Sequence, residues 1–173
     1  MSKTQENLAA AFAGESQARN KYTYFAGVAK KEGYHYIARL FEETAENEKR
    51  HAKDELMLLG GLGDTADCLK KAAEGEDYEV KSMYPEFARI AEEEGNTEAA
   101  NLFRQITKVE AHHRDRYNKL LEMVKNGTVY KRDEPIKWKC SVCGYIVDGT
   151  EPPPKCPCCK HPREYYEPAN MDI

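Results

Sequence analysis

Apolar side chains recur at three- and four-residue steps over most of residues 4–125, which is the spacing of one face of an α-helix. The pattern predicts four helices. Gly33 and Gly95 follow the first and the third of them, where a glycine readily ends a helix. The apolar positions are Leu8, Phe12, Tyr22, Phe25 and Ala29, then Ile37, Phe41, Leu58 and Leu59, then Met83, Phe87 and Ile90, and finally Leu102, Phe103, Ile106, Tyr117, Leu120 and Val124.

The two halves of this helical region form an internal repeat. The corresponding segments are Phe25-Ala26, Glu32-Gly33 and Leu40-Phe41 in the first half, and Phe87-Ala88, Glu94-Gly95 and Leu102-Phe103 in the second. Each half therefore predicts a helical hairpin. Two hairpins with short loops, joined by one long crossover that opens at Gly60-Gly61-Leu62-Gly63, match the ferritin-like four-helix bundle.

The helical period stops after Lys125. Residues 126–139, with Gly127, Pro135 and mixed charges, predict a linker. Residues 140–173 contain few apolar side chains, so they predict a small domain that needs a structural metal for its stability. The predicted organisation is a helical bundle over residues 1–125, a linker, and a small metal-bound domain.

Composition narrows the class of protein. Hydrophobic residues make up 40% of the chain and charged residues 32%, with a net charge of −4, and no basic patch suggests nucleic-acid binding. No apolar run reaches the ~20 residues of a membrane helix. The first residues lack the apolar core of a signal peptide, so a cytoplasmic location is expected.

Two Glu-x-x-His pairs, Glu48 with His51 and Glu110 with His113, carry the candidate chemistry. A lone glutamate precedes each pair: Glu15 lies 33 residues before Glu48, and Glu76 lies 34 before Glu110. Residues three apart share a helix face, and all these residues fall on the apolar stripes. Buried carboxylates need compensation, and this set predicts a dimetal site of iron or manganese.

Three further side chains lie near this set in sequence. Glu79 is one turn after Glu76, where an ordinary surface glutamate would also fit. Tyr22 and Tyr84 lie seven and eight residues after the lone glutamates. Core packing is the simpler role for both tyrosines, but their hydroxyl groups could also hold a metal ligand in place.

Five of the six cysteines lie in the last 34 residues. They contain the pattern Cys-x-x-Cys twice, which predicts a tetrahedral site for iron or zinc rather than disulfides. Cys158 interrupts the second pair, but only Cys159 completes the two-residue gap. The four predicted ligands are Cys140, Cys143, Cys156 and Cys159.

Over essentially its full length the chain resembles the rubrerythrin family. The segments that carry the resemblance are Ala-Gly-Glu15-Ser-Gln-Ala-Arg, Glu48-x-x-His51, Gly75-Glu76-Asp-Tyr-Glu79, Met83-Tyr84-Pro85, Glu110-x-x-His113 and the two cysteine pairs, which look like the knuckles of rubredoxin. The resemblance implies a diiron centre that includes Glu79 as a seventh ligand, and a mononuclear iron at the four cysteines. It also implies that one iron moves between Glu79 and His51 on redox change.

The function implied by the resemblance is a peroxidase that reduces hydrogen peroxide to water and protects against oxidative stress. Electrons would come from NAD(P)H through a rubredoxin reductase or a rubredoxin and enter at the four-cysteine iron. The implied assembly is a homodimer in which the small domain of one subunit lies near the diiron site of the other. Two alternatives are open: a ferritin-like protein that oxidises or stores iron, and a zinc-ribbon interaction module.

Overall fold

The computed structural model describes residues 2–170. Residue 1 and residues 171–173, the last three of the predicted small domain, lie outside the described residues. The chain divides into two compact units, residues 1–63 and 64–173. We describe each unit by itself.

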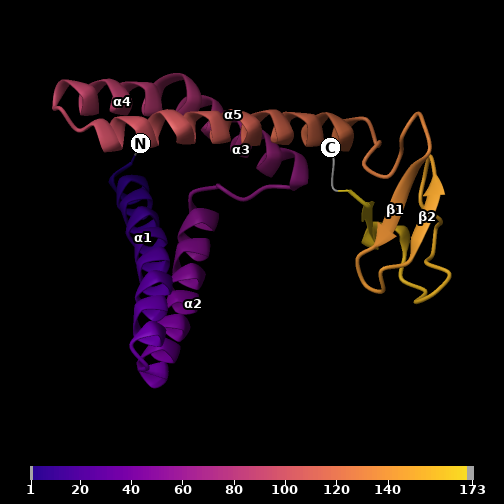
Figure 1. The fold of residues 1–173 in the computed structure, drawn as a ribbon, viewed down its shortest axis with the longest axis horizontal. Helices are drawn as coiled ribbons and strands as arrows, with labels where there is room; N and C mark the ends of the chain where they lie inside the picture. The colour runs from indigo at the N-terminus through magenta and orange to yellow at the C-terminus, as the bar shows by residue number, and fades with distance from the viewer. Residues whose placement is uncertain (1, 171–173) are drawn as a thin grey trace. The chain divides into compact units, whose positions relative to one another are not determined.

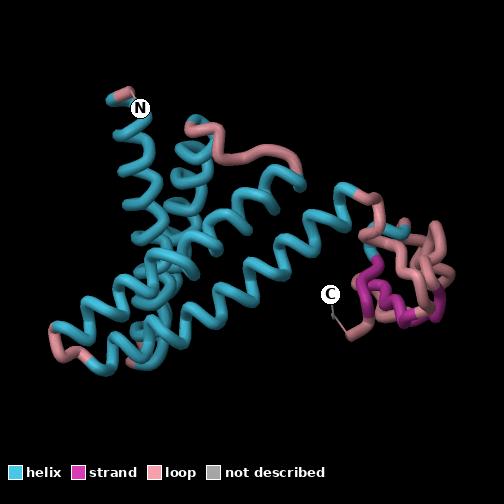
Figure 2. The backbone as a smooth tube through the Cα atoms, turned by 90° about the horizontal axis from the view of Figure 1, so that it is seen from above, coloured by secondary structure: helices cyan, strands magenta, loops and turns pink. Residues whose placement is uncertain are grey.

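The first unit is a hairpin of two long helices, α1 (Lys3–Lys31) and α2 (His35–Leu58), which lie side by side in Figures 1 and 2. Ser2 begins α1 with a reciprocal capping box, in which its side chain accepts from the backbone N–H of Gln5 and its own N–H donates to the Gln5 side chain. Gly33 turns the chain with a φ of 85°. The predicted first hairpin is therefore present.

Small side chains fill the space between α1 and α2. The buried residues are Ala26 and Ala29 on α1 and Ala38, Ala45 and Ala52 on α2. Alanine lets the two helices approach closely, but it buries little apolar area. Several larger side chains of the hairpin, among them Phe25, Ile37 and Leu40, therefore stay more than 40% exposed, although Phe41 packs against the alanines.

The second unit begins with a helical path made of α3 (Thr65–Tyr78), the π-helical turn η1 (Glu79–Met83) and α4 (Tyr84–Glu93). It returns as α5 (Thr97–Lys125), which packs against α3 and α4 to form the second predicted hairpin (Figure 1). Pro85 explains the π turn, because a proline has no N–H and its ring clashes with the carbonyl four residues earlier. The N–H of Tyr84 instead reaches back five residues to the carbonyl of Glu79.

A three-stranded antiparallel sheet with the order β2-β1-β3 forms the small C-terminal domain (Figure 2). Its strands are β1 (Ile136–Cys140), β2 (Ile146–Gly149) and β3 (Tyr166–Pro168), and the 3-10 turn η2 (Arg163–Tyr165) precedes β3. Trp138, Cys140, Cys156 and Tyr166 make its buried core. Strand β1 takes up the end of the segment that the sequence predicts as a linker.

The predicted fold class is confirmed: the chain is mainly helical, with the hairpins of a ferritin-like bundle and a small β domain that carries four cysteines. The prediction of a long crossover is wrong. Asp64 accepts from the N–H of Asp67 and so begins α3 at Thr65, which leaves only residues 59–64 between the hairpins. Among the described helices, none combines the length and the apolar character needed to cross a membrane.

Candidate metal centres

In the first hairpin, Glu15 of α1 meets Glu48 and His51 of α2. The Nδ1 atom of His51 lies 2.8 Å from a carboxylate oxygen of Glu48 and 3.8 Å from one of Glu15. One oxygen or nitrogen atom of each of the three residues lies within 4.8 Å of the others. Two ligands that are each about 2.1 Å from one metal ion can lie at most about 4.2 Å apart, so this group needs only small movements to bind one.

The second hairpin repeats the same arrangement with Glu76, Glu110 and His113. The Nδ1 atom of His113 lies 2.7 Å from Glu110 and 3.7 Å from Glu76. These values match those of the first hairpin within 0.1 Å. The internal repeat seen in the sequence is therefore a repeat of metal-binding geometry, with two carboxylates and one imidazole in each hairpin.

The π turn η1 accounts for the one extra residue between Glu76 and Glu110, compared with Glu15 and Glu48. A π turn holds one residue more than an α turn, so Glu76 and Tyr84 keep the orientations that Glu15 and Tyr22 have in the first hairpin. Glu79 is the first residue of this turn. The position three after Glu15 is Ala18, which leaves the second hairpin with one more carboxylate than the first.

In each Glu/Glu/His group the carboxylates lie close together, so that their ionised, negatively charged form is unfavourable. The hydrogen bond with Glu48 raises the pKa of Glu15, and burial adds to this effect. Burial also raises the pKa of Glu76 and Glu79, with a further contribution from the charge of Glu110. A bound cation would relieve this repulsion, which is the electrostatic condition expected of a metal site.

The ligands are only partly buried in the single hairpin: the side chains of Glu48, Glu76 and Glu110 are 15–19% exposed, while the histidines are more accessible. No charged side chain among the described residues is buried. The side chain of His51 is 58% exposed and that of His113 is 38% exposed. The reason is that each hairpin buries mainly alanines between its own helices and leaves the histidines of the ligand stripe partly uncovered.

Tyr22 and Tyr84 occupy equivalent places in two aromatic clusters. The ring of Tyr22 lies 6.2 Å from Phe25 and 6.1 Å from Phe41, while that of Tyr84 lies 6.4 Å from Phe87 and 6.0 Å from Phe103. Burial raises the pKa of Tyr84, and the charges of Glu79, Glu110 and Glu76 raise it further. Both rings therefore have a packing role, and the hydroxyl of Tyr84 also interacts electrostatically with the carboxylates.

One residue near the first group was not identified from the sequence. Glu55 lies one turn after His51, and its Oε2 atom is buried without a hydrogen-bond partner among the described residues. Its charge also contributes to raising the pKa of Glu15. The spacing could have indicated it, because residues 48, 51 and 55 fall on one helix face.

The four predicted cysteines meet in the small domain. The Sγ atoms of Cys140 and Cys159 lie 3.6 Å apart, as do those of Cys143 and Cys156. Four sulfurs at about 2.3 Å from one tetrahedral ion lie about 3.8 Å from one another, so the cluster fits a metal closely. Cys158 is exposed and lies outside the cluster.

Backbone turns hold the two cysteine pairs in matching loops. The N–H of Gly144 donates to the carbonyl of Cys140 (2.8 Å), and that of Lys160 donates to the carbonyl of Cys156 (3.0 Å). Burial raises the pKa of the Cys156 thiol, but hydrogen bonds from the backbone N–H groups of Cys159 and Cys158 help to lower it to about 6. These donors favour the thiolate, which is the form that binds metal.

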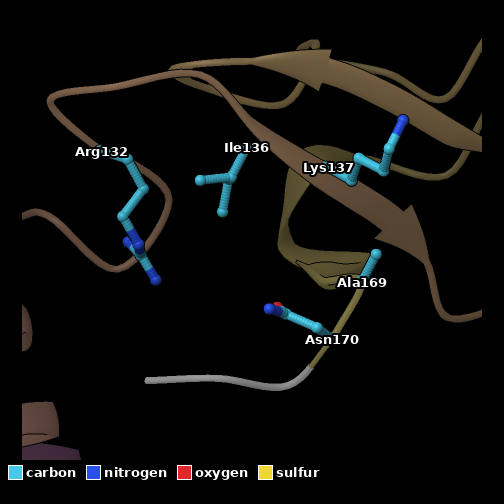
Figure 3. A pocket seen from close by; sticks show the side chains of 5 residues that line it. All are labelled: Arg132, Ile136, Lys137, Ala169 and Asn170. Atoms are coloured by element: carbon cyan, nitrogen blue, oxygen red, sulfur yellow. The ribbon is translucent and has the colours of Figure 1, made fainter.

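A separate cavity of about 510 Å³ in the small domain (Figure 3) is lined by Arg132, Ile136, Lys137, Ala169 and Asn170. Its two cations have partners within the domain. The Arg132 guanidinium lies 5.2 Å from the Trp138 ring and donates to the carbonyl of Thr128, while Lys137 pairs with Asp148 at 3.2 Å. We assign these cations a structural role in the domain.

Comparison with known proteins finds matching family models for both the helical region and the small domain. The rubrerythrin family model matches residues 6–121, and the model of the rubredoxin-like domain of rubrerythrins matches residues 138–167. A rubrerythrin of Porphyromonas gingivalis is 51% identical over 96% of this chain and 90% of its own length. Rubrerythrins of Clostridium perfringens and Nitratidesulfovibrio vulgaris are 47% and 42% identical, over 95% and 96% of this chain and 93% and 94% of their own lengths.

Proposed function

This chain belongs to the rubrerythrin family, and we propose that it is a non-haem diiron peroxidase that reduces hydrogen peroxide to water. The observation that carries the proposal is the pair of matching Glu/Glu/His groups on a chain that also holds a four-cysteine cluster. Membership of the family implies an oxidoreductase with a diiron centre. The substrate and the source of electrons are our proposals.

We assign seven ligands to the diiron centre: Glu15, Glu48, His51, Glu76, Glu79, Glu110 and His113. Reduction of one H2O2 to two H2O takes up two electrons and two protons, and two ferrous ions would supply the two electrons when bound. Glu48 and Glu110 would be the central ligands of the ions, because each lies against its own histidine and against the lone glutamate of its hairpin. Carboxylates suit this role because they accept several binding modes.

The four-cysteine cluster is proposed as the electron inlet. Cys140, Cys143, Cys156 and Cys159 would hold one iron, which passes one electron at a time. The electrons would come from NAD(P)H through a rubredoxin reductase or a rubredoxin. Reduced thiols at metal-binding spacing favour a cytoplasmic location for the whole system.

The main alternative, a ferritin-like iron store, predicts a different response to excess iron. If the protein is a peroxidase, we expect about three irons per chain after incubation with ferrous iron and air, two in the bundle and one at the cysteines. With NAD(P)H and a rubredoxin reductase, the same protein should reduce hydrogen peroxide continuously. Metal analysis after gel filtration and the decrease in NAD(P)H absorbance measure the two results.

The matched control for turnover is the same mixture without reductase, which should not consume NAD(P)H. Uptake of tens of irons per chain into a multi-subunit cage, without peroxide turnover, would support storage and reject the peroxidase proposal.

A further inference from the structure

The ligand stripe of each hairpin needs a covering partner. Ile37 lies three helical turns before Glu48 and is 44% exposed, and in the second hairpin Leu102 is 56% exposed. His51 and His113 are also accessible. Three or four ligands per hairpin cannot complete a dimetal centre, so the face that carries them is an incomplete site.

The connection between the hairpins is short and tightly structured. Gly60 and Gly61 close α2 with a Schellman motif, in which their N–H groups donate to the carbonyls of Met57 and Leu56. A side chain at position 61 would collide with Leu56, since a Cβ atom there would lie 2.1 Å from Leu56 Cδ1. Because Asp64 caps α3, only two residues remain between these two structured ends.

A ferritin-like bundle places a long crossover between its hairpins, so the end of α2 and the beginning of α3 lie at opposite ends of the bundle. Leu58 is ten residues beyond Glu48 and Thr65 is eleven before Glu76, as the helix bounds show. At about 1.5 Å per residue, the two ends are about 31 Å apart along the axis when both glutamates reach one metal centre.

The chain cannot cover this distance as it is folded. Seven steps from Leu58 to Thr65 reach about 25 Å even when fully extended. Closure within one chain would therefore require the Schellman motif and the end of α2 to unwind into a taut strand. Short, strained connections favour the exchange of identical elements between two copies.

We propose that each diiron centre is shared between two copies of this chain, with the first hairpin of one copy covering the second hairpin of the other. This inference rests on the diiron centre proposed above. Glu15, Glu48 and His51 of one copy would then face Glu76, Glu79, Glu110 and His113 of its partner. The internal repeat supplies two similar faces for this pairing, and each dimer contains two centres.

A heterodimer of two full-length variants tests the proposal through metal content alone. Glu48→Ala and Glu110→Ala chains are co-expressed with different affinity tags, and the doubly tagged dimer is isolated. In a shared arrangement, one bundle contains both substitutions and the other contains neither. We therefore expect about two bundle irons per heterodimer, in addition to the iron of the cysteine sites.

The homodimer of each variant is the matched control and should hold no intact bundle centre. If both ligand sets came from the same chain, every bundle of the heterodimer would carry one substitution. The heterodimer would then contain no intact centre, and this result would overturn the proposal. The metal-free wild-type protein should also be a dimer in native mass spectrometry, and a monomer would overturn the sharing. A wild-type dimer that binds no iron in its bundles would instead reject the proposed function.

Discussion

Alanine at Glu48 or at Glu110 is expected to abolish iron binding in the bundle. Each glutamate contacts both its own histidine and the lone glutamate of its hairpin, so its loss removes the central group of that hairpin's ligand set. We expect fewer than one bundle iron per centre and a lower thermal unfolding temperature, since the remaining carboxylates repel one another without a cation. Metal analysis and thermal unfolding followed by circular dichroism measure both effects.

Glu46→Ala is the matched control for this experiment. Glu46 lies on α2 two residues before Glu48, but it pairs with Lys49 on an exposed surface, where an ion pair contributes little to stability. This variant should keep all its iron. Two tightly bound irons in the Glu48→Ala or Glu110→Ala protein would show that the ligand assignment is wrong.

The second large effect is expected in the small domain, where Cys159→Ala should eliminate the visible absorption of the thiolate-bound iron. The Cys159 sulfur lies 3.6 Å from that of Cys140, within the tetrahedral cluster. The loss of one thiolate leaves three ligands and a weakened domain, because the cysteines are also part of its core. The iron spectrum and the iron content of the purified protein provide the measurement.

Cys158→Ala tests the neighbouring cysteine in the same way. Its side chain is exposed, and its backbone N–H, which favours the Cys156 thiolate, remains after the substitution. The visible spectrum should therefore be unchanged. If Cys158→Ala loses the spectrum while Cys159→Ala keeps it, the two assignments must be exchanged. A colourless wild-type protein with zinc at this site would instead favour the interaction-module alternative.

Much of the local structure could be predicted from the sequence, because it depends on local signals. The spacing of apolar residues indicated both hairpins, and Gly33 and Gly95 indicated their turns, which have φ values of 85° and 75°. The Glu-x-x-His spacing placed each histidine against its glutamate. These features involve residues within one or two helical turns of each other, where helix geometry alone decides what meets.

Features that depend on more distant contacts were missed. The π turn could have been inferred from Pro85 together with the extra residue between Glu76 and Glu110. The length of the crossover could not, because the glycines at 60, 61 and 63 suggested an open loop while the structure closes the first two into a helix cap. The partial exposure of the ligand histidines follows from the alanines between the helices, which a pattern of apolar and polar residues does not distinguish from larger side chains.

The reaction of a pre-reduced Cys143→Ala protein with hydrogen peroxide tests the central claim most directly. The claim is that the diiron centre carries out the chemistry and the four-cysteine iron only supplies electrons. Stopped-flow measurement should then show rapid consumption of about one peroxide per diiron centre, as in the wild type, followed by no further turnover with NAD(P)H and reductase. A reduced variant that retains its bundle iron but consumes no peroxide would contradict this division of roles.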